Sequence, residues 1–298
     1  MTGVRPAVAS RFTQRLGDRI GLTGTLLCLG LDPHPEALPA GFQRDLRGVE
    51  AFARLLLEAA APLASAVKAN LAFFEAFGGE GLAVLERLRG GLAPDQIFIA
   101  DAKRGDIGST STRHAAALFD HLGADAVTAS PYLGREGIGP LLEHAPGFVY
   151  VLCRTSNRGA GEFQDLAVAS VDGLGAGEMA AKTEPLYLHV ARRVAAWAEG
   201  GDGIGLVVGA TAPEELAAVR SAAPGTPFLV PGLGRQAGDI AAVREHAPAG
   251  AGAAFGLPGG VALVNVSRAI AESALGDVVD PGEAIRSAAR SWAEELRV

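Results

Sequence analysis

Residues 97–107 read Ile-Phe-Ile-Ala-Asp-Ala-Lys-Arg-Gly-Asp-Ile, so four apolar residues run directly into a cluster of charges. The apolar run predicts a strand buried on both faces, which is typical of a parallel sheet. Side chains two positions apart point to the same side of a strand, so Asp101 and Lys103 are predicted to lie together. Charges at the end of a buried strand are costly unless they are paired. The cluster is therefore either a structural ion pair beside a solvated loop or part of an active site.

Short apolar runs of the same kind recur along the chain, with stretches of helical character between them. Alternating strands and helices predict an α/β fold, either a (β/α)8 TIM barrel or a large doubly wound sheet, and the count of eight strands favours the barrel. No linker or repeat divides the chain, so we expect residues 1–298 to form a single barrel domain. The predicted strands are 25–31, 64–68, 97–101, 126–129, 148–153, 204–208, 227–230 and 261–266.

Apolar periodicity predicts the helices. Phe12, Leu16 and Ile20 form one apolar stripe, which predicts an extra helix at the N-terminus of the barrel domain. Two further helices are predicted at 113–122 and at 212–222. The first should end at a glycine, residue 123, and the second should begin with a capping box at residues 211–214.

Two long segments show no clear periodic pattern of apolar residues. Residues 155–182, after the fifth predicted strand, are rich in Gly, Ala and Ser, and we expect a long loop that is either a lid or a mobile insertion. Residues 247–267 carry no charge, but their Gly and Pro content predicts a loop followed by a buried strand rather than a membrane span. We therefore expect no membrane association.

Composition excludes one class of partner. Lys and Arg number 26 against 33 Asp and Glu, which gives a net charge of −7. Proteins that read nucleic acid usually carry a basic surface, so no nucleic-acid partner is predicted, although a small anion could still bind a local basic pocket. Cys28 and Cys153 lie in apolar runs and are interpreted as reduced core residues. With no evident signal peptide, a cytoplasmic location is expected.

Charged residues end two more of the predicted strands. Lys68 ends the second strand, and Asp32 follows the first. An isolated lysine at a strand end is more often a side chain whose stem covers apolar surface than a catalytic group. A set of acids and bases at three successive strand ends instead favours a shared active site at the C-terminal face of a barrel.

The loop after the seventh predicted strand reads Pro-Gly-Leu-Gly-Arg-Gln-Ala-Gly-Asp over residues 231–239. Its spacing is a weak match to a dinucleotide fingerprint, because no acidic residue follows at the expected distance. Together with Arg268 at the end of the eighth strand, the loop fits the phosphate site of TIM barrels. Backbone amides and a guanidinium bind phosphate without a metal ion. Taken alone, the glycines also fit a tight turn.

The pattern Asp-x-Lys-x-x-Asp-Ile over residues 101–107 resembles the signature of the orotidine 5′-phosphate decarboxylase family. The chain is similar to the longer bacterial form of that family over nearly its whole length. It departs from the family pattern at Ala69, at Arg158 and at Ser267, which concern ligand loops rather than the acid–base set. The similar stretches are LGLDPHP (29–35), VKANLAFFEAFG (67–78), DAKRGDIGSTS (101–111), RTSN (154–157), PGLGRQAGD (231–239) and VNVSRAI (264–270).

The resemblance implies a cofactor-independent and metal-independent enzyme that converts orotidine 5′-phosphate (OMP) to UMP and CO₂, the last step of de novo pyrimidine nucleotide synthesis. It implies that Lys103 protonates C6 of the pyrimidine and that Asp101 lies beside the substrate carboxylate. Lys68 and Asp32 would bind ribose hydroxyls, and Lys68 would join a charged chain with Asp101 and Lys103.

The resemblance also implies a homodimer in which Asp106, Ile107 and Thr110 reach the site of the partner subunit. The other substrate-binding residues that it implies are Ser156 at the pyrimidine and Pro231, Gly232, Gly234, Gln236 and Arg268 in and beside the phosphate loop.

The chemistry agrees with these roles. Loss of CO₂ from C6 leaves a carbanion in the plane of the ring, which no π-system delocalises. An ammonium group fixed at that carbon stabilises the charge and then protonates it. We therefore expect Lys103 to stay charged despite burial, with Asp101 and Asp106 opposing the effect of desolvation on its pKa.

From the residues alone, three other functions remain possible for this chain. Sugar-phosphate decarboxylases and hexulose-phosphate synthases share Asp-x-Lys on the third strand but need a magnesium ion. A Schiff-base aldolase would use Lys103 or Lys68 to form an imine. A non-catalytic barrel would bind UMP and leave OMP unchanged.

Overall fold

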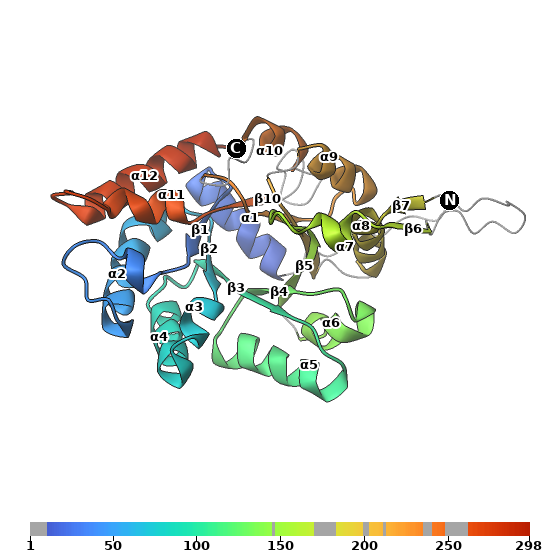
Figure 1. The fold of residues 1–298 in the computed structure, drawn as a ribbon, viewed down its shortest axis with the longest axis horizontal. Coiled ribbons are helices and arrows are strands. Elements are labelled where there is room, and N and C mark those ends of the chain that lie inside the picture. Colours follow the sequence, from blue (N-terminus) through green and yellow to red (C-terminus); the bar gives the residue numbers. More distant parts are fainter. Residues whose placement is uncertain are drawn as a thin grey trace, which may run out of the picture.

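Eight parallel strands close into a barrel in this computed structural model (Figure 1). β1 pairs with β2 on one side and with β10 on the other, which closes the ring and excludes a doubly wound sheet. The predicted TIM barrel is confirmed, and each strand lies where an apolar run predicts one. The strands, in barrel order, are β1 (Leu27–Leu31), β10 (Ala262–Val266), β9 (Phe228–Val230), β8 (Ile204–Val208), β5 (Phe148–Arg154), β4 (Ala126–Ala129), β3 (Ile97–Arg104) and β2 (Ala66–Asn70).

Helices form a ring outside the strands (Figure 1). The structure describes residues 11–144, 147–169, 183–198, 203–210, 213–234, 240–247 and 262–298. Short 3-10 turns occur at Pro35–Ala37, Ala61–Leu63 and Glu272–Ala274. The helices are α1 (Arg11–Thr23), α2 (Leu46–Ala60), α3 (Ala72–Glu75), α4 (Gly78–Gly90), α5 (Gly108–Ala115), α6 (Gly134–Leu142), α7 (Gly161–Gln164), α8 (Leu186–Trp197), α9 (Pro213–Ala222), α10 (Ile240–His246), α11 (Arg268–Ala271) and α12 (Pro281–Glu295).

The predicted N-terminal helix is α1, which covers the amino end of the barrel. Its apolar stripe of Phe12, Leu16 and Ile20 is fully buried. Phe12 stacks on Phe148, the first residue of β5, with ring centroids 4.4 Å apart. Because α1 closes this end, the opposite end, where the strands terminate, is left for a ligand.

The other helix predictions are partly corrected. The helix predicted at 113–122 begins earlier, at Gly108, and its second half, Ala116–His121, is π-helical. Its first turn was missed because Gly-Ser-Thr-Ser-Thr carries no apolar period. Gly123, with φ of 70°, follows the end of the helix as predicted. α9 confirms the helix predicted at 212–222, while the capping residue at 211 lies outside the described residues.

The segment after β5 is more ordered than its composition predicts. It contains α7 and a strand, β6 (Ala167–Ala169), which pairs antiparallel with β7 (Thr183–Pro185). A wholly irregular loop over 155–182 was therefore wrong for its described part, and residues 170–182 lie outside that part.

The uncharged stretch ends as expected, in the buried strand β10. Its residues 248–261 lie outside the described part of the chain. No helix in the described residues is long and apolar enough to cross a bilayer. Cys28 and Cys153 are free and buried, as predicted.

Candidate active site

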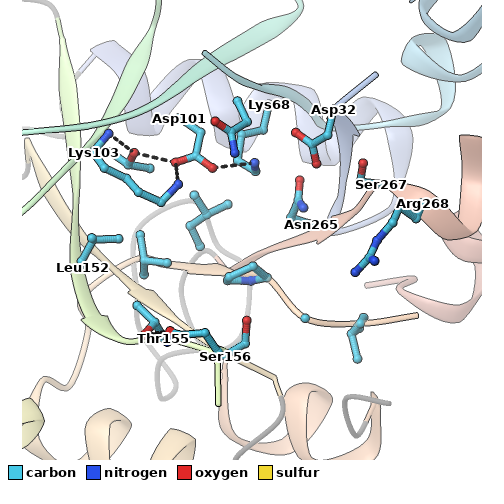
Figure 2. Close-up of a pocket in the computed structure, with 18 of the residues that line it drawn as sticks. Asp32, Lys68, Asp101, Lys103, Leu152, Thr155, Ser156, Asn265, Ser267 and Arg268 are labelled. Carbon is cyan, nitrogen blue, oxygen red and sulfur yellow. Dashed lines mark hydrogen bonds and ion pairs between the residues drawn. The ribbon is translucent and has the colours of Figure 1, made fainter. Parts of the chain in front are cut away.

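A cavity of about 340 Å³ opens at the carboxyl ends of the barrel strands (Figure 2). Three of the charged residues predicted for the site come from adjacent strands: Asp32 directly follows β1, Lys68 belongs to β2 and Asp101 to β3. The lining residues are Asp32, Lys68, Asn70, Asp101, Lys103, Thr128, Leu152, Thr155, Ser156, Asn157, Val207, Leu229, Pro231, Gly232, Leu233, Asn265, Ser267, Arg268 and Ala269.

A row of charges runs along one wall of this cavity (Figure 2). Lys68 Nζ donates to Asp101 Oδ2 at 2.9 Å, and Lys103 Nζ donates to Asp101 Oδ1 at 2.6 Å. The Lys68 and Asp101 side chains are 5% and 11% exposed, whereas that of Lys103 is 48% exposed. The ammonium group of Lys103 therefore faces the cavity while it remains tied to the buried carboxylate.

The surroundings keep the buried pair ionised. Burial alone would lower the pKa of Lys68, but the negative charges of Asp32 and Asp101 outweigh it and raise this pKa above its usual range. Burial alone would raise the pKa of Asp101, but the charges of Lys68 and Lys103 lower it well below its usual range. Both groups are charged at neutral pH.

The expected burial of Lys103 is wrong for the single chain, because its side chain is about half exposed. The reason is its place near the end of β3, beyond Asp101, the last residue of this strand that pairs with β2. Asp106 lies farther along, and its carboxylate accepts a hydrogen bond from the backbone N–H of Ile107 at 2.7 Å. The described lining of the cavity does not include Asp106, Ile107 or Thr110.

The backbone at Lys103 is unusual. Its φ of 49° is the only positive value among the non-glycine residues that the structure describes. The pairing of β3 with β4 also shifts register, since Ala100 pairs with Val127 but Arg104 pairs with Ala129. Asp101 and Lys103 do meet, as predicted, although the strand is not regular there.

Beside the row of charges, at the ends of β1 and β10, the cavity holds acceptors that lack donors. Asp32 Oδ1 and Asn265 Oδ1 are both buried and have no hydrogen-bond partner within the described structure. A buried acceptor without a partner costs free energy, about 1–3 kcal/mol for each. These two atoms suit a ligand with hydroxyl groups.

A cationic group enters at the end of the cavity away from Lys103. Arg268 follows β10 directly after Ser267, and its side chain extends along the cavity edge (Figure 2). Pro231 and Gly232, which follow β9 next to β10, also line the cavity, and Gly232 has φ of 105°, which favours glycine. Gly234, with φ of 87°, is outside the described lining. Gln236 falls outside the described residues.

The wall facing the charged row comes from the segment after β5. Ser156 lies on this wall, across the cavity from Asp101 (Figure 2). α7 braces the segment, because Gln164 Oε1 accepts from the backbone N–H of Thr155 at 3.0 Å. Arg154, at the end of β5, forms ion pairs with Asp165 and Glu215 at 3.0 and 3.1 Å. The two residues before Ser156 are thus anchored to α7, to the residue that follows it and to α9.

Eleven of the lining residues were not predicted as site residues, and three of these are polar side chains on the barrel strands themselves: Asn70, Thr128 and Asn265. Asn70 lies two positions after Lys68 on one strand, so the rule that paired Asp101 with Lys103 would have found it. Thr128 and Asn265 are single polar residues within apolar strands. A single polar side chain in an otherwise apolar strand is a signal of a site residue, and it could have identified both.

Fold and site define an α/β-barrel enzyme with a lysine–carboxylate row and a cationic end in one cavity. The family model described as Orotidine 5′-phosphate decarboxylase / HUMPS family matches residues 25–285. A protein of Thermomicrobium roseum named orotidine 5′-phosphate decarboxylase is 45% identical over 229 residues, 77% of this chain and 78% of that protein. One of Roseiflexus castenholzii with the same name is 42% identical over 272 residues, 91% of this chain and 90% of the relative. This chain belongs to the orotidine 5′-phosphate decarboxylase / HUMPS family.

Solved structures of similar proteins have the same fold as this chain. A putative orotidine-monophosphate decarboxylase from Toxoplasma gondii superposes with a TM-score of 0.82 at 32% identity, and the match covers 96% of this chain and 95% of that one. The OMP decarboxylase of Leishmania donovani superposes with a TM-score of 0.76 at 35% identity, covering 96% of each chain.

Proposed function

We propose that this chain decarboxylates orotidine 5′-phosphate to UMP and CO₂, the last step of de novo pyrimidine nucleotide synthesis. The observation that carries the proposal is the row Lys68–Asp101–Lys103 in the barrel mouth, with contacts of 2.9 and 2.6 Å. Family membership adds to it, because the relatives reported above carry this name. The row offers a fixed ammonium group beside a carboxylate, which is what a reaction through a carbanion requires.

In the proposed reaction the bond between C6 and the carboxylate carbon breaks, and its electron pair stays on C6 as CO₂ leaves. The ammonium group of Lys103 stabilises this charge and then gives a proton to C6, so that UMP forms. Its side chain is about half exposed in the single chain, so solvent can restore the proton to the amine. Asp101 lies beside the substrate carboxylate and holds Lys103 in position.

The remaining groups fit the rest of OMP. Asp32 and Asn265 present buried acceptors without donors, which the ribose hydroxyls would supply. Arg268 would bind the phosphate, with Pro231, Gly232, Gly234 and Gln236 in the adjacent loop, and Ser156 would hydrogen-bond the pyrimidine. Binding energy at the phosphate, far from C6, can organise the site around the ring.

We also propose a homodimer in which Asp106, Ile107 and Thr110 enter the partner's site. Support comes from apolar side chains on the surface beside α5 and α6: Ile107 is 55% exposed and Tyr132 is 87% exposed. Ser111 Oγ and the backbone N–H of Asp106 both donate to Gly137 O, so α5 and α6 present one continuous surface. Exposed apolar groups clustered in this way suit a protein interface.

A cytoplasmic location completes the proposal. Both cysteines are free thiols, which suits a reducing compartment. Burial raises the pKa of Cys28 to about 12, so this thiol is protonated and unreactive at neutral pH.

The direct test is to add OMP to the purified protein in the presence of EDTA and to follow the loss of OMP absorbance in the ultraviolet. We expect turnover, and no turnover would refute the proposed function. A requirement for added Mg²⁺ would favour the synthases of the same family. Trapping of a substrate by borohydride would indicate an imine, and UMP binding without turnover would indicate a non-catalytic barrel.

A further inference from the structure

The hydroxyl of Thr128 stands at the point where β3 leaves its regular pairing with β4. Between the pairs Ala100–Val127 and Arg104–Ala129, three residues of β3 face Thr128 alone. Within this bulge Lys103 has the positive φ of 49°. Residues other than glycine rarely adopt this left-handed conformation, because the side chain crowds the backbone there. Something must therefore hold the lysine backbone in place.

Thr128 makes two hydrogen bonds there through one atom. Its Oγ1 accepts from the backbone N–H of Lys103 at 3.0 Å and donates to Asp101 Oδ1 at 2.8 Å. Asp101 Oδ1 also accepts from Lys103 Nζ at 2.6 Å, so the hydroxyl, the carboxylate and both ends of the lysine form a closed ring of contacts. Asp101 Oδ2 is occupied by Lys68, which leaves the carboxylate little freedom to rotate.

From this geometry we infer that Thr128 is a positioning residue, whose hydroxyl sets the location of the Lys103 ammonium group for proton transfer. The inference rests on the proposed function. A hydroxyl is needed because one atom must both accept a hydrogen bond from the Lys103 N–H and donate one to Asp101. Thr128 is only 1% exposed, so bulk water cannot easily replace these two hydrogen bonds. Without it the Lys103 N–H loses its partner, and the strained backbone can relax and carry Nζ away from C6.

The test compares Thr128→Val, which keeps the shape and removes the hydroxyl, with Thr128→Ser, which keeps the hydroxyl. We expect Thr128→Val to lower kcat for OMP about 100-fold, the effect of a displacement of about 1 Å at a reacting group. KM should change by less than about threefold, because the ribose and phosphate contacts remain. Thr128→Ser should recover at least about a third of the wild-type kcat, since it restores both hydrogen bonds.

Thr25→Val is the matched control. The Thr25 hydroxyl also accepts from one backbone N–H, of Leu27, and donates to one carbonyl, of Leu296, but at the amino end of β1. It is fully buried. Its loss should lower the melting temperature in the same way as Thr128→Val while leaving kcat per folded molecule at the wild-type value.

Each contrary result has a separate meaning. If wild-type protein does not turn over OMP, the proposed function fails. If wild type is active and Thr128→Val keeps more than about a third of its kcat, the positioning role is wrong. A rise in KM with kcat unchanged would make Thr128 a substrate contact and would also overturn the inference. So would a Thr128→Ser variant as slow as Thr128→Val.

Discussion

Replacing Lys68 by methionine removes the cation from the most buried ion pair of the cavity and keeps a side chain of similar length. We predict that Lys68→Met lowers the free energy of unfolding by about 3–5 kcal/mol at pH 7, the usual cost of breaking a buried pair on one side. The reason is that Asp101, 11% exposed, loses one of its two cationic partners, the buried one.

The expected shift in melting temperature follows from the size of the chain. Unfolding entropy is about 2.1 cal/mol/K per residue, or roughly 0.6 kcal/mol/K for a chain of this length. A loss of about 3–5 kcal/mol then lowers the melting temperature by about 5–8 °C. Scanning calorimetry or urea unfolding of the two proteins measures this directly.

The effect should depend on pH in a defined direction. The pKa of folded Asp101 is depressed, so in wild type its ionisation stabilises the fold above the unfolded pKa of about 3.9, and this contribution is lost as pH falls through the lower, folded pKa. In Lys68→Met this contribution is smaller, because the main lowering charge is gone. The difference in stability between the two proteins should therefore be largest above about pH 4 and shrink as the pH falls below about 4, toward the depressed pKa of folded Asp101.

Arg54→Met is the control. Arg54 pairs with Glu50 at 2.7 Å on the surface of α2, where its side chain is 44% exposed. Its loss should cost less than about 1 kcal/mol. If Lys68→Met were as mild as this control, or if its effect did not diminish on acidification, our account of the charged row would be refuted.

Three further predictions concern activity. Lys103→Ala should keep its fold and lose more than about 99% of turnover, because general acid catalysis alone supplies about 10²–10⁴-fold, and greater residual activity in a steady-state assay would contradict the assigned role. Arg268→Ala should lower kcat/KM for OMP but match wild type on orotidine, which lacks the phosphate, and a large difference on orotidine would mean that Arg268 acts elsewhere. Lys103→Ala and Asp106→Ala homodimers should both be inactive, yet dissociating, mixing and reassociating them should restore about a quarter of wild-type activity, because half of the dimers are then mixed and each has one intact site. Hybrid dimers that form but stay inactive would place Asp106 in the site of its own subunit.

The barrel was predictable because its strands are buried on both faces, and such strands read as uninterrupted apolar runs. The bounds of β4 and β8 match those predicted. The charged residues could be placed for a related reason: in a closed parallel barrel the carboxyl ends of strands meet at one mouth, so Lys68 and Asp101 had to be neighbours.

Three other features, at Lys103 and at the start of α5, escaped prediction because they have no local signal in the sequence. The left-handed backbone of Lys103 depends on a hydrogen bond to a residue 25 positions away. The half-exposure of the Lys103 side chain depends on how far β3 runs past its last pair with β2, which composition does not report. The start of α5 was missed because its first turn is polar, and polar residues are compatible with loop and helix alike.

The buried acceptors of Asp32 and Asn265 that lack hydrogen-bond donors lower the stability of the empty protein. Apolar replacements of similar size, such as Asn265→Leu, would remove a desolvated polar atom from a barrel interior that is otherwise well packed, and should make the empty protein harder to unfold. Selection for thermal stability alone would therefore favour apolar substitutions at these cavity residues first. A search for stabilised variants of this barrel should spare this wall of the mouth and look instead to surface positions on its outer helices.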